Sequence, residues 1–511
     1  MDHNGDHKAT NNATDNADRY GADNETGQFG PIFSRRYVLA MGGGAALAAV
    51  LAACGSDSES SETTAGAPAT TSASTSAAPT TAGSTGSAGS TTPASTSGSG
   101  TPASGGTNAA KFGGGGGDGT FKIGFTAPLT GPLAGFGEAN DFILEGINEL
   151  AKDGIMIGDK SYKVEIIVQD VESNSDTAAS RASSLILDDK VDMMVAIATP
   201  EMINPVADQC EANGVPCLST LAPWQPYFLG RGGDPATGFD WTFHFFWGAE
   251  QLVGVFTEMW NSVSTNKKLG LLCGNDPDGN ALADAKTGYP AGATGAGYTV
   301  VDPGRFTVLS DDFSSIIGQF KDENVEILTG IPLPPDFATF WTQAKQQGFN
   351  PKLVTMAKAI LFASAVEALG DSGDGLASEI WWTPNHPLAS SLTGITAKEL
   401  SDQYEESTGK QWTQFVGFVH ALFEQAFDVI ARAGSTDKQA LAEAAGATKL
   451  DTIVGPLEFG AEGLPKNVSR TSLVGGQWQK TDGGKYPFDL VVTNNSLSPE
   501  IPKTGDLKPL A

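Results

Sequence analysis

The chain has 511 residues, long enough for about two or three domains, and its 59 acidic and 31 basic residues give a formal net charge of −28. A negative field of this size repels nucleic acid and anionic lipid, so we exclude a nucleic-acid partner. Four cysteines in so long a chain exclude a scaffold built on disulfides.

Residues 1–53 are predicted to be an export signal. Arg35 and Arg36 precede an apolar stretch, residues 37–53, that is too short and too rich in glycine and alanine for a bilayer span. The paired arginines resemble a twin-arginine signal, an address read by an export receptor. The stretch ends in Leu-Ala-Ala-Cys, which resembles the bacterial lipobox, so we expect the Cys54 thiol to be diacylated and to become the mature N-terminus. This predicts an extracytoplasmic protein anchored by lipid to the outer face of the cell membrane.

Residues 54–117 consist almost entirely of Ser, Thr, Ala, Gly and Pro. Such a segment cannot bury enough apolar surface to offset the entropy lost on ordering, so we predict a disordered tether. We assign its final glycine run, residues 113–117, to the tether and not to a phosphate-binding loop, because no strand precedes it and no Lys-Ser/Thr pair follows.

The folded part begins near residue 118 and alternates strands with helices. In chain order we expect a strand at 121–127, a helix with Ile143 and Ile147 on its apolar face, a strand at 164–168, a helix at 177–187 and a buried strand at 193–197. The next helix begins at Thr199-Pro200-Glu201, where Thr suits the N-cap and Pro the first helical position. This alternation predicts a parallel, doubly wound α/β sheet.

The alternation starts again after an aromatic stretch at residues 241–247. We expect strands at 269–273, 325–328 and 352–355, and a helix with Phe313, Ile316, Ile317 and Phe320 on one face. Two such α/β units joined by extended segments predict two lobes with a cleft between them.

Three motifs follow one another in this part of the chain. They are Ile123–Gly137 with its Leu-Thr-Gly-Pro turn, Gly214–Ser219, and Val454–Phe459 with its Gly-Pro-Leu-Glu-Phe sequence. Together they resemble the type I periplasmic-binding fold, specifically the branched-chain amino-acid-binding receptors of ABC importers, over residues 121–478.

The resemblance implies a hinged clamp in which the ligand binds between the lobes and closure forms the surface that a membrane permease recognises. It implies a monomeric receptor without catalytic activity, cofactor or metal. The ligand would be small and organic: an amino acid-like molecule, an amide or a carboxylate. The expected ranges are 118–246 and 384–451 for the first lobe, 247–383 and 452–485 for the second, and 486–511 for a C-terminal tail.

The resemblance also carries over candidate ligand-binding residues. Those in the first lobe and at the crossing between lobes are Phe136, Thr199, Ser219, Ala222, Trp224 and Trp247. The hydroxyl of Thr199 and the free N–H groups of a helix N-terminus would also suit an anion, although the alternative is a simple helix cap. The aromatic residues could instead pack in the core or at the hinge.

Asp278 and Lys358 complete the candidate site in the second lobe. Asp278 stands where the family commonly has Tyr, and Lys358 stands where amino-acid-binding members carry an acid for the ligand's ammonium. A lysine would repel an ammonium and favour an anion. We therefore hypothesise a ligand that is a carboxylate lacking the amine; the alternative is that Lys358 is solvated and lies outside the cleft.

Other chemistry has weaker support in the sequence. His244, His386 and His420 show no metal-ligand spacing, and no Gly-x-Ser-x-Gly elbow is present. Cys210 and Cys217 could form a disulfide outside the cell or remain inert buried thiols. Two rival functions stay open: a ligand-sensing module that acts with a separate signalling partner, and an exported hydrolase.

Overall fold

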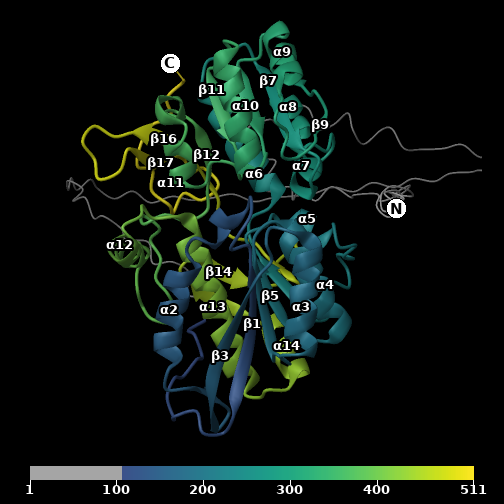
Figure 1. Ribbon diagram of the computed structural model, residues 1–511, viewed down its shortest axis with the longest axis vertical. Coiled ribbons are helices and arrows are strands. Elements are labelled where there is room, and N and C mark those ends of the chain that lie inside the picture. Colours follow the sequence, from purple (N-terminus) through teal and green to yellow (C-terminus); the bar gives the residue numbers. More distant parts are fainter. Residues whose placement is uncertain (1–105, 511) are drawn as a thin grey trace, which may run out of the picture. The chain divides into compact units, whose positions relative to one another are not determined.

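Two β-sheets organise the part of the chain that the structure describes, residues 106–510 of a computed structural model. The predicted signal peptide, Cys54 and the greater part of the predicted tether lie outside the described residues. Each sheet forms the centre of one lobe, and the two lobes lie one above the other in Figure 1. Within residues 106–510 no helix has both the length and the apolar character needed to cross a bilayer.

The first lobe is built on a seven-stranded sheet in the order β15-β6-β5-β4-β1-β3-β2. Its strands are β1 (Thr120–Ala127), β2 (Ile155–Ile157), β3 (Lys160–Asp170), β4 (Met193–Ile197), β5 (Cys217–Thr220), β6 (Thr242–Phe245) and β15 (Val468–Ser469). Every neighbouring pair is parallel except the edge pair β2–β3. Because β3 and β4 lie on opposite sides of β1, the sheet is doubly wound, as predicted.

Helices cover both faces of this sheet. On one side α3 (Ser175–Leu187) packs against α4 (Pro200–Asn213), and on the other α2 (Asn140–Ala151) packs against the long, largely buried α13 (Gln414–Ala433), as Figure 1 shows. The remaining elements of this lobe are η1 (Ala134–Gly137), α5 (Trp224–Phe228), α12 (Ala397–Thr408), α14 (Lys438–Gly446) and the hairpin of β13 (Lys449–Thr452) and β14 (Gly455–Glu458).

The second lobe is built on a sheet in the order β17-β16-β12-β11-β10-β7-β8, with β9 (Arg305–Phe306) paired to β7. Its other strands are β7 (Lys268–Gly274), β8 (Thr299–Val301), β10 (Ile327–Gly330), β11 (Leu353–Met356), β12 (Ala377–Ile380), β16 (Val474–Lys480) and β17 (Phe488–Asn494). The strands from β7 to β12 are parallel, whereas β16 and β17 are antiparallel to their neighbours. The helices are α6 (Ala249–Asn261), α7 (Pro277–Leu282), α8 (Tyr289–Gly295), α9 (Ser314–Asp322), α10 (Pro334–Gln346), α11 (Ala363–Glu367) and the short η2 (Gly370–Gly373).

The chain crosses between the sheets three times, after β6, after β12 and after β15. We expected the last crossing at residue 452, and this is too early: Val468 and Ser469 of β15 pair with β6, so the chain stays with the first sheet up to Ser469. The expected C-terminal tail also needs correction, because its residues 488–494 form β17 and pair with β16.

The predicted end of the tether is also wrong, because residues 106–117 pack on the first lobe. The Asn108 side chain donates a hydrogen bond of 2.9 Å to the carbonyl oxygen of Glu424, and the rings of Phe112 and Phe427 meet edge to face at 5.1 Å. The segment therefore adds contacts to the buried helix α13.

The glycine run at 113–117 lies against the β2–β3 edge. Gly114 has a φ of +86°, and a Cβ atom there would lie 2.6 Å from the Cβ of Ser161. Only glycine combines this backbone conformation with so close an approach, which gives the run a structural reason that composition alone does not reveal.

Candidate functional site

A small cavity lies between the lobes, at the carboxyl ends of the parallel strands of both sheets. Its volume is about 20 Å³, enough for about one water molecule. The first lobe and the crossing after β6 contribute Phe136, Thr199, Leu221, Pro223, Phe246 and Trp247. The second lobe and the crossing after β12 contribute Asp278, Ile331, Lys358, Leu361, Glu379 and Trp381. This is where open α/β sheets bind ligands.

Three of the nine non-glycine residues with positive φ in the described part of the chain lie at or beside this cavity. Ala198, Leu221 and Lys358 have φ values of +117°, +78° and +63°, and each follows the end of a parallel strand, β4, β5 or β11. A non-glycine residue with positive φ is uncommon, and such strain gathers at ligand sites and switch regions. Two of the three, Leu221 and Lys358, line the cavity directly.

Aromatic rings form the apolar wall. Phe136 of η1 contacts Phe362 and Phe415 at ring-centre distances of 5.6 and 5.1 Å. Phe246 lies 5.0 Å from Trp247 and 5.1 Å from Trp381, so the residues at two crossings between lobes touch each other. The wall therefore joins the cavity to two of the segments that connect the lobes.

An ion cluster contributes Lys358 and Asp278 to the lining of the cavity. The Nζ atom of Lys358 lies 3.1 Å from Oδ2 of Asp276 and 3.1 Å from Oδ2 of Asp278, and each of the three residues is at most 7% exposed. The Lys358 backbone N–H donates to Oε1 of Glu379 at 3.0 Å, which holds the residue in its strained conformation. Oδ1 of Asp276 caps α7 by accepting from the N–H of Gly279 at 2.6 Å.

Burial and neighbouring charges shift the protonation of this cluster. Burial disfavours the ammonium, but Asp276 and Asp278 outweigh it and raise the pKa of Lys358 well above its ordinary value. Burial raises the pKa of Asp278. Burial also raises the pKa of Glu379 and the pKa of Glu201, each to about 7. Lys358 is therefore charged, whereas the two glutamates titrate near neutrality.

Several polar atoms of the lining residues lack hydrogen-bond partners although they are buried. They are Oγ1 of Thr199, Nε1 of Trp247, Oδ1 of Asp278 and Nε1 of Trp381. Thr199 stands at the N-cap of α4, yet its hydroxyl makes no capping hydrogen bond. Unpaired buried polar groups are costly, so their gathering at one cavity marks it as a place where a further molecule can be held.

The structure places five of the eight expected ligand-binding residues on this cavity: Phe136, Thr199, Trp247, Asp278 and Lys358. Lys358 faces the cleft, but its ammonium is already paired with two aspartates.

The structure does not bring Ser219, Ala222 and Trp224 to the cavity. The Ser219 hydroxyl lies 2.9 Å from Nδ1 of His244, and Nε2 of the same ring lies 2.7 Å from the carbonyl oxygen of Ala222. Burial lowers the pKa of His244 to about 3, so the neutral ring links β5, β6 and the loop after β5. Trp224 is buried and donates toward Glu250. These residues support the loop that carries Leu221 and Pro223 into the cavity.

Glu379 and Trp381 are site residues that the sequence reasoning missed. Glu379 lies in β12 and Trp381 follows this strand directly, and we expected a ligand role for neither. An acid inside a buried strand, Ala377–Ile380, was the available signal, because a buried carboxyl needs a partner or a function.

The remaining chemical candidates do not form a site. Cys210, Cys217 and Cys273 are free and buried, so the disulfide considered for Cys210 and Cys217 is not formed in this structure. Within residues 106–510 no group of three His, Cys, Asp or Glu side chains is arranged to hold a metal.

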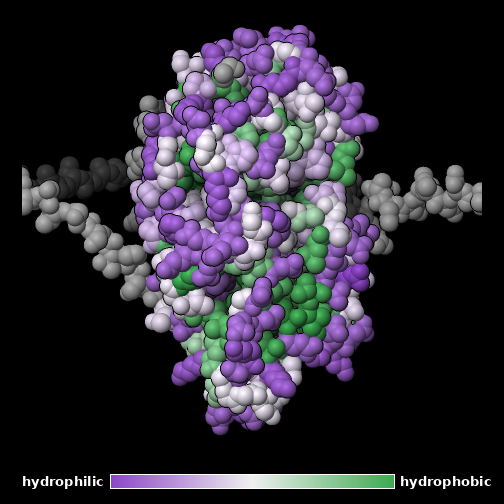
Figure 2. Space-filling view, turned by 60° about the vertical axis from the view of Figure 1, so that its left-hand side comes forward, coloured by the Kyte–Doolittle hydropathy of each residue, from purple (hydrophilic) through white to green (hydrophobic). Residues whose placement is uncertain are grey.

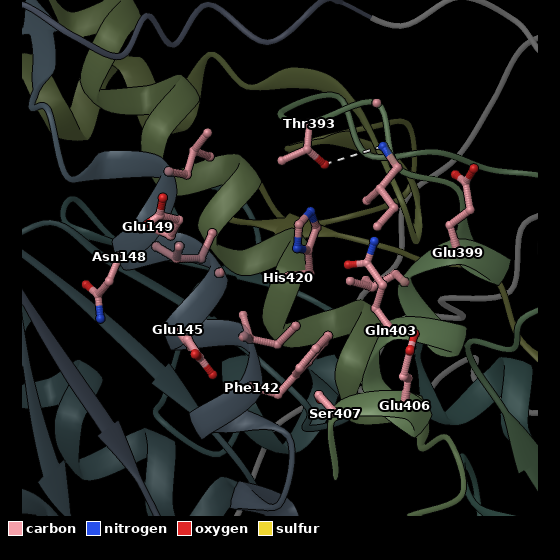
Figure 3. Close-up of a pocket in the computed structure, with 17 residues that line it drawn as sticks. Phe142, Glu145, Asn148, Glu149, Thr393, Glu399, Gln403, Glu406, Ser407 and His420 are labelled. Carbon is pink, nitrogen blue, oxygen red and sulfur yellow. Dashed lines mark hydrogen bonds between the residues drawn. The ribbon is translucent and has the colours of Figure 1, made fainter. Parts of the chain in front are cut away.

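A larger groove of about 1320 Å³ lies on the outside of the first lobe, between α2, α12 and the loop at 393–395 (Figure 3). Its labelled acidic side chains are Glu145, Glu149, Glu399 and Glu406. The buried His420 at this groove has its Nε2 atom 2.8 Å from the Ser390 hydroxyl. Figure 2 shows apolar residues gathered on this lobe, whereas the second lobe is mostly hydrophilic on the same face. The groove involves one lobe and none of the strained strand ends, so we do not take it as the candidate site.

Comparison with known proteins identifies relatives of this chain. A family model described as "Periplasmic binding protein" matches residues 120–475. The Leu/Ile/Val-binding protein homolog 3 of Brucella melitensis is 24% identical over 356 residues, 67% of this chain and 87% of that protein.

Two solved structures have the same fold. The leucine binding protein LivK of Thermotoga maritima has a TM-score of 0.60 at 19% identity and covers 74% of this chain and 99% of its own. An ABC-transporter solute binding protein of Rhodopseudomonas palustris, in complex with 3,4-dihydroxybenzoic acid, has a TM-score of 0.59 at 18% identity and covers 74% and 98%. The match of the family model over most of the chain shows that this protein belongs to the periplasmic binding protein family.

Proposed function

We propose that this chain is the solute-binding component of an ABC importer, which captures a small organic molecule between its two lobes and delivers it to a membrane permease. The observation that carries the proposal is the cavity at the carboxyl ends of both parallel sheets, lined by residues of both lobes and by two of the crossings between them. The relatives with this fold include a leucine binding protein and a solute binding protein of an ABC transporter.

Binding requires the lobes to separate. A cavity of about 20 Å³ holds about one water molecule, whereas an organic ligand needs a space of hundreds of Å³. The three crossings are the segments that can bend, and closing the lobes on a ligand would shape the surface that a permease reads.

The export signal and lipobox at the N-terminus support an extracytoplasmic location, with acylated Cys54 holding the receptor near the permease. The family to which the chain belongs is in keeping with this location.

The test is binding together with closure. Full-length protein in detergent would be screened by thermal shift against amino acids, amides, amines and carboxylates, and hits would be measured by small-angle X-ray scattering of the protein with and without the ligand. A hit at about a hundred times its dissociation constant adds about 2.7 kcal/mol to stability, an easily measured shift. The proposal expects a hit that also reduces the radius of gyration. Turnover of a hit, or no binding across the library, would contradict it.

A further inference from the structure

Carboxyl groups outnumber ammonium groups around the cavity between the lobes. Asp278 and Glu379 line it, and Asp276 shares the ammonium of Lys358. Glu201, on the first turn of α4, interacts electrostatically with the same lysine and with both aspartates. Among the described residues that line the cavity, Lys358 is the only basic one. The single ammonium of Lys358 therefore faces the two aspartates, and Glu379 and Glu201 add further negative charge as they ionise near neutrality.

The ammonium of Lys358 already forms ion pairs with two carboxylates. Its ammonium has three N–H donors, and two of them face Asp276 and Asp278 at 3.1 Å. Removing it from these partners would leave two buried carboxylates without a counter-charge, which is strongly destabilising. Lys358 is therefore a poor partner for an incoming carboxylate, which argues against the anionic ligand that we hypothesised from the sequence.

Buried polar atoms without hydrogen-bond partners show which interactions a ligand could form at the cavity. Oδ1 of Asp278, a residue that lines the cavity, is a buried acceptor with no donor. Oε2 of Glu201, a carboxyl beside the cavity-lining Thr199, is a further buried acceptor with no donor. Carboxylate oxygens accept hydrogen bonds and attract positive charge, and Phe136 and Trp247, which line the same cavity, are aromatic residues of the kind that attracts a cation. These features converge on a positively charged group of the ligand.

Two indole donors complete the set. Trp247 and Trp381 both line the cavity, and the Nε1 atom of each is buried and donates to no acceptor within residues 106–510. They call for a hydrogen-bond acceptor on the ligand, and that acceptor need not be charged. A ligand carboxylate near Thr199 would meet Glu201 in the same first turn of α4, where Oε2 is an additional buried acceptor.

We propose that the ligand is a small organic cation, an amine or amidine that carries a neutral hydrogen-bond acceptor and no carboxylate. This inference rests on the proposed function and gives its substrate class. Asp278 holds the positive group, and Glu201 adds negative charge through its coupling to the same acid cluster. The aromatic wall covers the apolar body, and the two indole N–H groups bind the neutral acceptor. Lys358 partly neutralises the acid cluster so that it can be buried, and does not bind the ligand.

The experiment uses two matched sets of probes with full-length protein in detergent, measured by isothermal titration calorimetry. The aliphatic set is 4-aminobutanol, 4-aminobutyrate, 4-hydroxybutyrate and butane-1,4-diol. The aromatic set is tyramine, tyrosine, 3-(4-hydroxyphenyl)propanoate and tyrosol. In each set one scaffold carries an amine only, an amine and a carboxylate, a carboxylate only, or neither.

We expect the amine-only member of at least one set to bind at least about tenfold more tightly than the carboxylate and zwitterionic members, a factor of ten being about 1.4 kcal/mol. Tighter binding of a carboxylate or a zwitterion would overturn this inference and leave the proposed function intact. Binding of none of the amines would overturn it as well, and the library screen with scattering would then decide the proposed function on its own.

Two variants sharpen the test. Asp278→Asn keeps the shape of the side chain and is expected to weaken amine binding by about tenfold or more. Lys358→Met removes the competing cation and is expected to strengthen amine binding. The matched control is Lys398→Met, in an exposed pair with Asp402 on α12, which should leave affinity unchanged. Loss of amine binding in Lys358→Met, with a native circular dichroism spectrum, would overturn the inference; if this variant does not fold, Asp278→Asn alone decides.

Discussion

Replacing Lys358 with methionine is expected to lower the free energy of unfolding by about 3–5 kcal/mol at about pH 7, because it leaves Asp276 and Asp278 buried without their counter-charge. The ammonium is 3.1 Å from each carboxylate, and its side chain is 4% exposed, so solvent cannot replace it. With an entropy of unfolding of about 2.1 cal/mol/K per residue and about 400 ordered residues, a loss of about 4 kcal/mol lowers Tm by about 5 °C.

The assay is chemical and thermal unfolding of the full-length protein, followed at about pH 7 and about pH 5. Burial holds the folded-state pKa of Asp278 above its ordinary value, and this shift grows in the variant once Lys358 is gone. A group with a raised folded-state pKa contributes stability at low pH and loses it as pH rises, so the defect of the variant should grow from the lower pH to the higher.

A triple variant provides the internal check. Adding Asp276→Asn and Asp278→Asn to Lys358→Met removes the unpaired charges and should recover most of the lost stability. Lys398→Met breaks an exposed pair and should change stability by less than about 1 kcal/mol. A Lys358→Met protein as stable as the wild type at both pH values would refute the reasoning, because it would mean that the ammonium does not hold the acid cluster together.

Three further predictions concern other parts of the chain. Burial raises the pKa of Glu379 to about 7, so the stability of the wild type should fall as pH rises from about 5 to 8. Glu379→Gln keeps the acceptor for the Lys358 N–H and should flatten this fall, measured as the denaturant midpoint at each pH. An unchanged pH dependence would contradict the raised pKa of Glu379. Gly114→Ala should lower the free energy of unfolding by about 1–3 kcal/mol in urea, because it combines a positive φ with a clash at Ser161. The control is Gly463→Ala, which is also at positive φ but has open space around it, so it should show the cost of the backbone strain alone. Cys54→Ala should move the protein from the membrane fraction to the soluble fraction, and mass spectrometry of the wild type should find an acylated N-terminal cysteine; a water-soluble wild type would refute lipidation.

The fold could be predicted because its central strands are continuous apolar runs. Met193–Ile197 is buried at every position and reads as a strand covered on both faces. The last crossing could not be predicted, because β15 has only two residues and no periodicity can mark so short a strand. Its place in the first sheet depends on pairing with β6, more than two hundred residues earlier.

The candidate site was predictable in position but not in chemistry. Thr199 and Lys358 follow strand ends, and that is enough to bring them to the cleft. The role of Lys358 depends on partners about eighty residues away in sequence, at the end of β7, and no local pattern links them. Ser219 and Trp224 were assigned to the ligand from the resemblance, yet their side chains turn to His244 and Glu250, because a loop can keep its path while its side chains face inward.

The three crossings between the sheets also have a consequence for how the protein is made. The first sheet lacks its edge strand until Val468 and Ser469 have left the ribosome, and the second gains β16 and β17 only from residues 474–494. Each lobe therefore completes its sheet only when strands that are distant along the chain meet. Such non-local pairing favours slow folding and leaves early intermediates with open sheet edges.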